Sequence, residues 1–207
     1  MKKDPLNLIV CGVGGQGNIL IARLLGRVFA SYGYFVNIGE TFGAAQRGGA
    51  VFSSLRISKK REHGPLIPRG MGHLILGLEP LETLRMLSLY GNPEIIALTN
   101  DHEVFPVDVL GGRDRYPDKF ELLRVIETAS RMAWAVPATR IAVELKAPIV
   151  TNIVMLGALV DSSVLPLKPD KIIEQIKMSV PENRIELNLE AFKRGRLSIN
   201  KQYPLAK

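Results

Sequence analysis

The sequence predicts an α/β fold with a Rossmann-like, mostly parallel sheet, flanking helices and a helical C-terminal part. Short apolar segments of strand length alternate with amphipathic helical segments through residues 6–136. The first of these strands ends in a glycine-rich loop that leads directly into a helix. Beyond residue 136 the pattern is helical. We therefore expect a single domain over residues 1–207, with its sheet core at 1–136 and its helical part at 137–195.

The composition is that of a soluble globular protein, with 46% hydrophobic and 23% charged residues in a chain of 207. The net charge of +7 is dispersed, and the longest basic block is Lys59-Lys60-Arg61. Aromatic residues do not interleave with the basic ones, so nucleic-acid binding is not expected. No apolar run approaches the roughly 20 residues that span a bilayer, and the first is too short for a signal peptide. We expect a cytoplasmic protein without membrane contact.

The chemistry-bearing residues argue against a metal centre on this chain. Cys11 is the only cysteine, which excludes an internal disulfide. It also excludes an iron–sulfur cluster held by this chain alone, because such clusters are usually held by four thiolates. The three histidines, His63, His73 and His102, are scattered, so no zinc site is expected.

The segment from residue 8 to residue 40 resembles a dinucleotide-binding unit. A strand at residues 6–11 is followed by Gly12-Val13-Gly14-Gly15-Gln16-Gly17, which matches G-x-G-x-x-G. A helix then runs to about Tyr32, Gly33 is placed to cap it, and a second strand covers residues 34–38. Glu40 stands near the position of a ribose-binding acid. One interpretation is therefore an NAD(P)- or flavin-dependent reductase. Another is that the glycines only allow tight packing of the helix on the sheet.

A second glycine-rich segment follows Glu40. It reads Thr-Phe-Gly-Ala-Ala-Gln46-Arg47-Gly48-Gly49 and places one arginine among small residues. Backbone N–H groups and a guanidinium exposed together suit a carboxylate or phosphate. The alternative is a mobile loop with a solvated arginine. Because both glycine segments follow strands, and ligands meet open α/β sheets at the carboxyl ends of strands, we expect the working surface at that edge.

The remaining elements follow from periodicity and from turn residues. Residues 50–58 alternate in polarity and predict a strand with one wetter face, antiparallel or at an edge. Further strands are expected at 73–77, 94–98 and 133–136, and helices at 80–90 and at 119–131, the latter with Phe120, Leu123 and Ile126 inward. Residues 100–118 form a long loop.

The C-terminal part is predicted as a set of helices. These cover residues 137–146, a buried apolar segment at 149–160, and two proline-initiated helices at 169–178 and 181–194, the last capped by Gly195.

Three motifs together resemble the gamma subunit or gamma domain of 2-oxoacid:ferredoxin oxidoreductases. They are the G-V-G-G-Q-G loop with E-T-F-G-A-A-Q-R-G-G-A-V-F-S-S-L-R-I-S after the second strand, N-I-V-M-L-G from Asn152, and N-L-E-A-F-K-R-G from Asn188. The resemblance covers nearly the whole chain. It is strongest to the small (beta) subunit of the indolepyruvate type.

The resemblance implies an oxidative decarboxylation in which an aryl pyruvate becomes an acyl-CoA and ferredoxin is reduced. In that family thiamine diphosphate, Mg2+ and [4Fe-4S] clusters belong to the large (alpha) subunit, and coenzyme A is a co-substrate. This sequence agrees, since it has one cysteine and no Gly-Asp pair for the thiamine motif. The chain alone is expected to be inactive and to hold no cofactor. Whether it self-associates without its partner stays open.

The resulting hypothesis is a docking subunit with no catalytic residue of its own. Gly12, Gly14, Gly15 and Gly17 would allow close backbone approach. Gln16, Gln46 and Arg47 would supply hydrogen bonds and positive charge to the large subunit, to coenzyme A or to the substrate carboxylate. The dinucleotide-dependent reductase and a pure scaffold remain its rivals.

Overall fold

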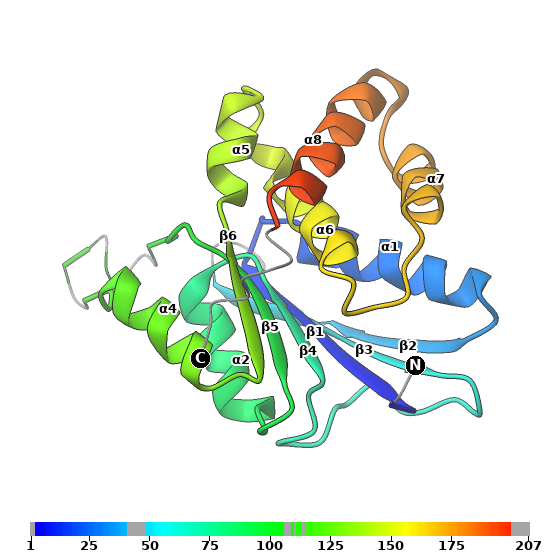
Figure 1. The fold of residues 1–207 in the computed structure, drawn as a ribbon, viewed down its shortest axis with the longest axis horizontal. Coiled ribbons are helices and arrows are strands. Elements are labelled where there is room, and N and C mark those ends of the chain that lie inside the picture. Colours follow the sequence, from blue (N-terminus) through cyan, green and yellow to red (C-terminus); the bar gives the residue numbers. More distant parts are fainter. Residues whose placement is uncertain (1–2, 41–48, 106–108, 110, 113–114, 200–207) are drawn as a thin grey trace.

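The computed structural model describes residues 3–40, 49–105, 109, 111–112 and 115–199. The first half of the fold contains the elements β1 (Leu6–Val13), α1 (Asn18–Ser31), β2 (Phe35–Glu40), β3 (Ala50–Ser58), β4 (Leu74–Gly77), α2 (Pro80–Tyr90) and β5 (Ile96–Asn100). It continues with α4 (Lys119–Thr128), β6 (Met132–Val136), α5 (Ala138–Glu144), η2 (Pro148–Val150), α6 (Thr151–Asp161), α7 (Pro169–Ser179), η3 (Glu182–Arg184) and α8 (Ile185–Leu197). These elements confirm the predicted α/β class (Figure 1).

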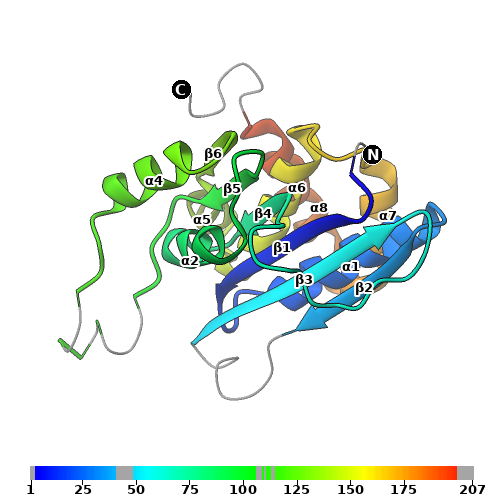
Figure 2. The ribbon, with the colours of Figure 1, turned by 90° about the horizontal axis from the view of Figure 1, so that it is seen from below.

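The six strands form one sheet in the order β2-β3-β1-β4-β5-β6 (Figure 2). Three neighbouring pairs, β1–β4, β4–β5 and β5–β6, are parallel, as expected for a Rossmann-like sheet. β3 is antiparallel to both β1 and β2. Its predicted antiparallel direction is therefore confirmed, but it is an interior strand, and β2 forms the edge instead. β2 consequently runs parallel to β1, but β3 lies between them.

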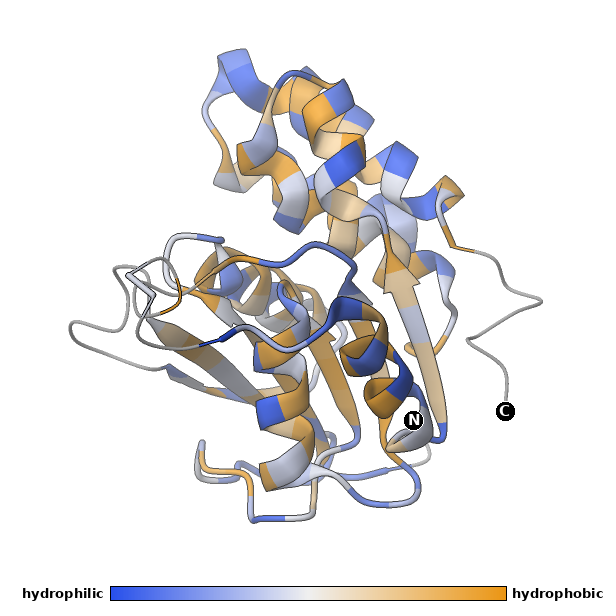
Figure 3. Cartoon of the chain, turned by 90° about the vertical axis from the view of Figure 1, so that its left-hand side faces the viewer, coloured by the Kyte–Doolittle hydropathy of each residue, from blue (hydrophilic) through white to orange (hydrophobic). Residues whose placement is uncertain are grey.

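Helices cover both faces of this sheet. On one face Leu8 and Val10 of β1 pack into a core with α1 and the C-terminal helices. On the other face Ile9 and Cys11 pack into a smaller core with α2 and α4. The alternation along β1 thus divides its side chains between two apolar layers, which explains why every residue of this strand is buried. In Figure 3 the central strands are coloured as largely hydrophobic, whereas the helices mix both colours.

The predicted buried segment forms α6, which packs against α8 and α5 and also contacts α1 and β5. Its residues from Asn152 to Val160 are all buried. α8 crosses it where Gly157 and Gly195 meet. A Cβ on Gly157 would lie 2.2 Å from the carbonyl oxygen of Phe192, and a Cβ on Gly195 would lie 2.0 Å from that of Val154. The expectation that Gly195 caps the last helix is therefore wrong, because it lies inside α8 and permits this close crossing.

Two further predictions are corrected by the packing. Phe120 is 75% exposed rather than inward, because α4 buries the stripe that contains Leu122 and Ile126. Ile149 is not part of the buried helix, since it lies in the 3-10 turn η2 and is 76% exposed. β5 also begins two residues later than expected and ends at Asn100.

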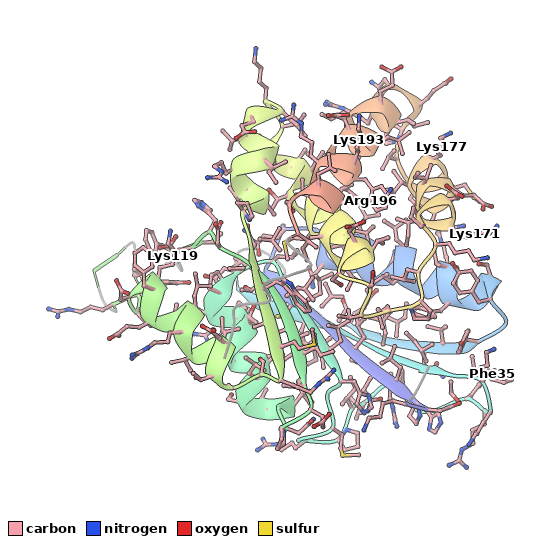
Figure 4. The ribbon with its side chains drawn as sticks, in the orientation of Figure 1. Phe35, Lys119, Lys171, Lys177, Lys193 and Arg196 are labelled. Atoms are coloured by element: carbon pink, nitrogen blue, oxygen red, sulfur yellow. The ribbon has the colours of Figure 1, made fainter. Side chains whose placement is uncertain are left out.

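The positive charge is spread over the helical surface rather than gathered. Figure 4 shows Lys171 and Lys177 on α7 and Lys193 on α8 extending outward from the helical layer. Several basic residues have acidic partners nearby, as Lys171 does with Glu174 at 2.9 Å. Among the described residues no helix is long and apolar enough to cross a membrane.

Candidate functional site

The loop between β1 and α1 is filled by its own glutamine. The side-chain Oε1 of Gln16 accepts a hydrogen bond from the backbone N of Val13 at 2.7 Å, and its Nε2 donates to the carbonyl oxygen of Leu78 at 3.2 Å. A Cβ on Gly12 would lie 2.5 Å from the same Oε1. The amide of Gln16 thus occupies the space beside Gly12, and it links the ends of β1 and β4.

The other glycines of this loop also serve contacts within the chain. Gly14 donates its backbone N–H to the carbonyl oxygen of Gly49 at 2.8 Å. Gly17 has a φ of 85° and approaches α6 so closely that a Cβ would lie 2.1 Å from Nδ2 of Asn152. Gly15, with a φ of 101°, is the exposed tip of the loop and has nothing within 4 Å of a built Cβ. Among the described residues of this loop, Gly15 is the most exposed.

Glu40 lies apart from the loop and is already engaged. Its carboxylate pairs with the guanidinium of Arg23 through contacts of 3.3 and 3.4 Å. Ser53 of β3 is paired with Glu40 on one side and with Val10 of β1 on the other. Two strand spacings of about 4.8 Å therefore separate β2 from β1. A dinucleotide-binding unit places these strands side by side, so Glu40 does not stand where a ribose-binding acid is required.

Of the second glycine-rich segment, the structure describes Gly49. Gln46, Arg47 and Gly48 lie outside the described residues. Glu40 and Gly49, which flank this segment, both lie at the carboxyl edge of β1 and β2. The structure therefore brings Gly12, Gly14, Gly15, Gln16, Gly17 and Gly49 together and leaves Glu40 aside.

A hollow of about 270 Å³ opens beside this loop at the carboxyl ends of the parallel strands. Gly15 and Gln16 form one wall. The remaining lining comes from His102, Val104, Thr139, Pro148, Ile149 and Thr151. Four of these six residues belong to α5, η2 and α6, so the helical part completes a site that the sequence had placed on the sheet alone.

Asn100 holds the walls of this hollow in place, and sequence reasoning missed it. Its Nδ2 donates to the carbonyl oxygen of Leu78 at 3.2 Å and lies 2.8 Å from Oγ1 of Thr139. Its Oδ1 accepts from the backbone N of Thr139 at 3.2 Å. The side chain is fully buried. The sequence did offer one indication, since Asn100 is a polar residue at the end of the apolar strand β5.

Glu79 is a second buried anchor at the same edge. Its carboxylate accepts from the backbone N of Glu82 at 2.8 Å, which caps α2, and from the hydroxyl of Tyr116. Burial raises the pKa of Glu79. The carboxyl group thereby ties the end of β4 to the segment that leads into α4.

The described residues offer no arrangement typical of catalysis or metal binding. No group of three or more His, Cys, Asp or Glu side chains within them could hold a metal ion. Cys11 is buried in the sheet, and burial raises the pKa of its thiol well above the ordinary value, which makes it unreactive. What the geometry provides is a rigid, hydrogen-bonded edge with an exposed glycine tip.

Comparison with known proteins identifies the chain's relatives. The family model described as pyruvate ferredoxin/flavodoxin oxidoreductase matches residues 7–198. The indolepyruvate oxidoreductase subunit IorB of Pyrococcus horikoshii is 35% identical over 190 residues, which cover 91% of this chain and 93% of that protein. The 2-oxoglutarate synthase subunit KorC of Methanothermobacter marburgensis is 30% identical over 205 residues, covering 95% of this chain and 96% of its own length.

Solved structures share the fold at lower identity. The gamma subunit of a keto/oxoacid ferredoxin oxidoreductase from Geobacter sulfurreducens has a TM-score of 0.66 at 22% identity and covers 93% of this chain and 97% of its own. The 2-oxoglutarate:ferredoxin oxidoreductase of Magnetococcus marinus has a TM-score of 0.73 at 22% identity; the match covers 99% of this chain but spans 33% of that longer one. The resemblance found in the sequence motifs is thus confirmed, and the chain belongs to the pyruvate ferredoxin/flavodoxin oxidoreductase family.

Proposed function

We propose that this chain is the small, cofactor-free subunit of an indolepyruvate-type 2-oxoacid:ferredoxin oxidoreductase. The observation that carries the proposal is end-to-end similarity to indolepyruvate oxidoreductase subunits, which exceeds the similarity to 2-oxoglutarate synthase subunits. The reaction would convert aryl pyruvates to acyl-CoA while ferredoxin is reduced. The substrate assignment rests on the names of those relatives.

The thiamine diphosphate, the Mg2+ and the iron–sulfur clusters of such an enzyme would sit on the large subunit. The residues of this chain do not fit them. Its one thiol, Cys11, is buried between the sheet and α2, whereas a cluster usually requires four thiolates. The residues that the structure describes also contain no group of three or more His, Cys, Asp or Glu side chains that could hold a metal ion. The chain's contribution is therefore binding and positioning.

The carboxyl edge of the sheet is the docking surface in this proposal. Gly15 is exposed there, and Ile149 beside it leaves 76% of its surface uncovered. Phe105, on the segment that follows β5, is 49% exposed. Large apolar side chains exposed near a hollow are typical of interaction surfaces. In the 2-oxoglutarate:ferredoxin oxidoreductase of Magnetococcus marinus, the matching fold covers 33% of a longer chain. A separate chain with this fold would instead bind its partner non-covalently.

The rival, a stand-alone dinucleotide-dependent reductase, fits the site less well. A dinucleotide-binding unit needs both a loop that opens toward the phosphates and an acid on the neighbouring strand. Here the N–H groups of Val13, Gly14 and Gln16, which precede α1, are donated within the chain, and Glu40 is held by Arg23 one strand away from β1. Titration with NADH, monitored through the fluorescence of Trp134, tests this directly. Saturable quenching would favour the reductase.

The decisive experiment is co-expression with the large subunit and an anaerobic assay of the purified complex. We expect reduction of ferredoxin or of a viologen dye that depends on indolepyruvate, on coenzyme A and on both chains. Activity with pyruvate or 2-oxoglutarate instead would agree with the family assignment and refute the assignment of aryl pyruvates as substrates. Failure of the two chains to associate would refute the docking role.

Arg47 is the residue that we propose to contact the partner, coenzyme A or the substrate carboxylate most directly. A desolvated charge contact typically costs about 2–5 kcal/mol when one partner is truncated. Arg47→Ala should therefore reduce assembly or turnover by at least about thirtyfold and leave the melting temperature of the isolated chain unchanged. An assembled variant complex with normal turnover would contradict this role.

A further inference from the structure

A second hollow lies at the opposite edge of the sheet, where the parallel strands begin. Its volume is about 430 Å³, within the range of small-molecule sites. Leu6 opens β1 and Leu74 opens β4, and Ile96 opens β5 beside them. Leu165, from the connection between α6 and α7, covers them. The eight residues of β1 place this hollow on the order of 25 Å from the glycine loop, so it is separate from the proposed docking edge.

His73 supplies a hydrogen-bond donor to this apolar hollow. Its Nδ1 accepts from the backbone N of Asn7 at 2.9 Å, while its own backbone N donates to the carbonyl oxygen of Asn7 at 2.9 Å. Burial, with a smaller effect of Lys3, lowers the pKa of His73, so the ring is neutral at pH 7. The neutral ring then carries its proton on Nε2. No acceptor for this proton is found among residues 3–40, 49–105 and 115–199.

Arg131 supplies a positive charge on the same wall. Its backbone N donates to the carbonyl oxygen of Ile95 at 2.8 Å, which fixes the base of the side chain at the start of β6. Its Nε lies 3.7 Å from Oε2 of Glu94, beyond hydrogen-bond length, and both side chains are well exposed. Such an exposed pair contributes little. The guanidinium fork is thus available to an anion of better geometry.

From these contacts we propose that the hollow binds a small carboxylate with a compact apolar body. The carboxylate would accept from Arg131 and from Nε2 of His73, and the body would lie against Leu6, Leu74, Ile96 and Leu165. A carboxylate is favoured over a phosphate because most of the lining is apolar, and its charged residues are Arg131, Lys3 and Glu94, the last of which already faces Arg131. A neutral apolar molecule would give Nε2 of His73 no acceptor and Arg131 none beyond Glu94.

Titration of the full chain, labelled with 15N, with phenylacetate and with phenylacetamide tests this inference. The amide keeps the shape of the probe and removes its charge. We expect amide-resonance shifts at Leu74, Ile96 and Arg131 with phenylacetate, and binding at least about tenfold weaker for phenylacetamide. Equal binding of the two probes, or shifts that leave these residues unaffected, would overturn the proposal.

Two variants locate the site independently of overall stability. Arg131→Gln should weaken phenylacetate binding about tenfold and leave phenylacetamide unaffected. Leu165→Trp should fill the hollow and abolish binding of both probes. Arg124→Gln, an exposed arginine on the neighbouring helix α4, is the matched control and should bind as the unmodified chain does. Unchanged binding in Arg131→Gln, or equal losses in both arginine variants, would refute the assignment.

Discussion

Replacing Gly157 by alanine should destabilise the protein strongly, because two backbones meet at this position. The new Cβ would lie 2.2 Å from the carbonyl oxygen of Phe192 and 2.9 Å from the backbone N of Arg196. Ordinary van der Waals contact begins at 3.4 Å, so α6 and α8 would have to part by 3.4 − 2.2 = 1.2 Å. No side chain can turn aside to relieve this contact, since both neighbouring atoms belong to the main chain of α8.

The magnitude follows from two opposing effects. Overpacking of a close-packed interior costs typically 1–3 kcal/mol, and rigid backbone on one side puts this site at about 3 kcal/mol. Alanine is favoured over glycine inside a helix by about 1 kcal/mol. The net loss in the free energy of unfolding is thus about 2 kcal/mol, which corresponds to a melting temperature lower by roughly 4–8 °C for a chain of this size.

Gly26→Ala in α1 is the matched control. Its Cβ would lie 2.9 Å from Cδ1 of Ile38, the far end of a flexible side chain. The same gain in helix propensity applies there, and the melting temperature should change by less than about 2 °C. Differential scanning calorimetry of the two variants decides the matter. Equal melting temperatures for Gly157→Ala and Gly26→Ala would refute the argument from the helix crossing.

Three further outcomes follow from the contacts at the carboxyl edge and in the sheet. Gln16→Leu should lower the free energy of unfolding in urea by about 1–3 kcal/mol, because the N–H of Val13 loses its acceptor and the carbonyl of Leu78 loses one of its two donors, keeping Asn100; an unchanged midpoint would contradict this. The raised folded pKa of Glu79 means that its contribution to stability is present below its unfolded pKa of about 4.5 and is lost as pH rises through the folded value. Glu79→Gln should therefore make stability less dependent on pH above about 4.5 in pH-dependent denaturation, and an identical profile would argue against it. Cys11 should resist a thiol reagent in the native chain and react fully in guanidinium, and rapid native labelling would show that the strand opens.

Local sequence patterns predicted where the helices and strands lie. Contacts between distant segments decided which face of a helix is buried and what an individual glycine does. The strand, glycine loop and helix at residues 6–31 were predicted because each depends on neighbours in sequence. Phe120 was misplaced because the inward face of α4 depends on which stripe meets α2 and the sheet, and two apolar stripes compete there. Gly195 was misread because a glycine near a helix end resembles a cap unless the crossing helix is known.

The position of β3 in the sheet shows that a strand's own sequence does not specify its neighbours. Its alternating pattern predicted an antiparallel strand, yet nothing in residues 50–58 specifies which neighbours it pairs with. The structure inserts it between β1 and β2. That insertion alone moves Glu40 away from the glycine loop, so a motif that matched in sequence did not match in space.

The chemistry of a glycine loop is therefore decided by where its N–H groups point. A loop that binds phosphate leaves them free at the start of a helix. Here Gln16 turns its amide back over Gly12, and Gly14 donates to Gly49, so the loop fixes the carboxyl edge and leaves Gly15 as its exposed tip. In the docking proposal, a loop of this kind would stabilise the edge that meets the partner. The charged contact with the partner would then come from outside the loop, which is why Arg47 is the residue whose replacement tests the docking proposal.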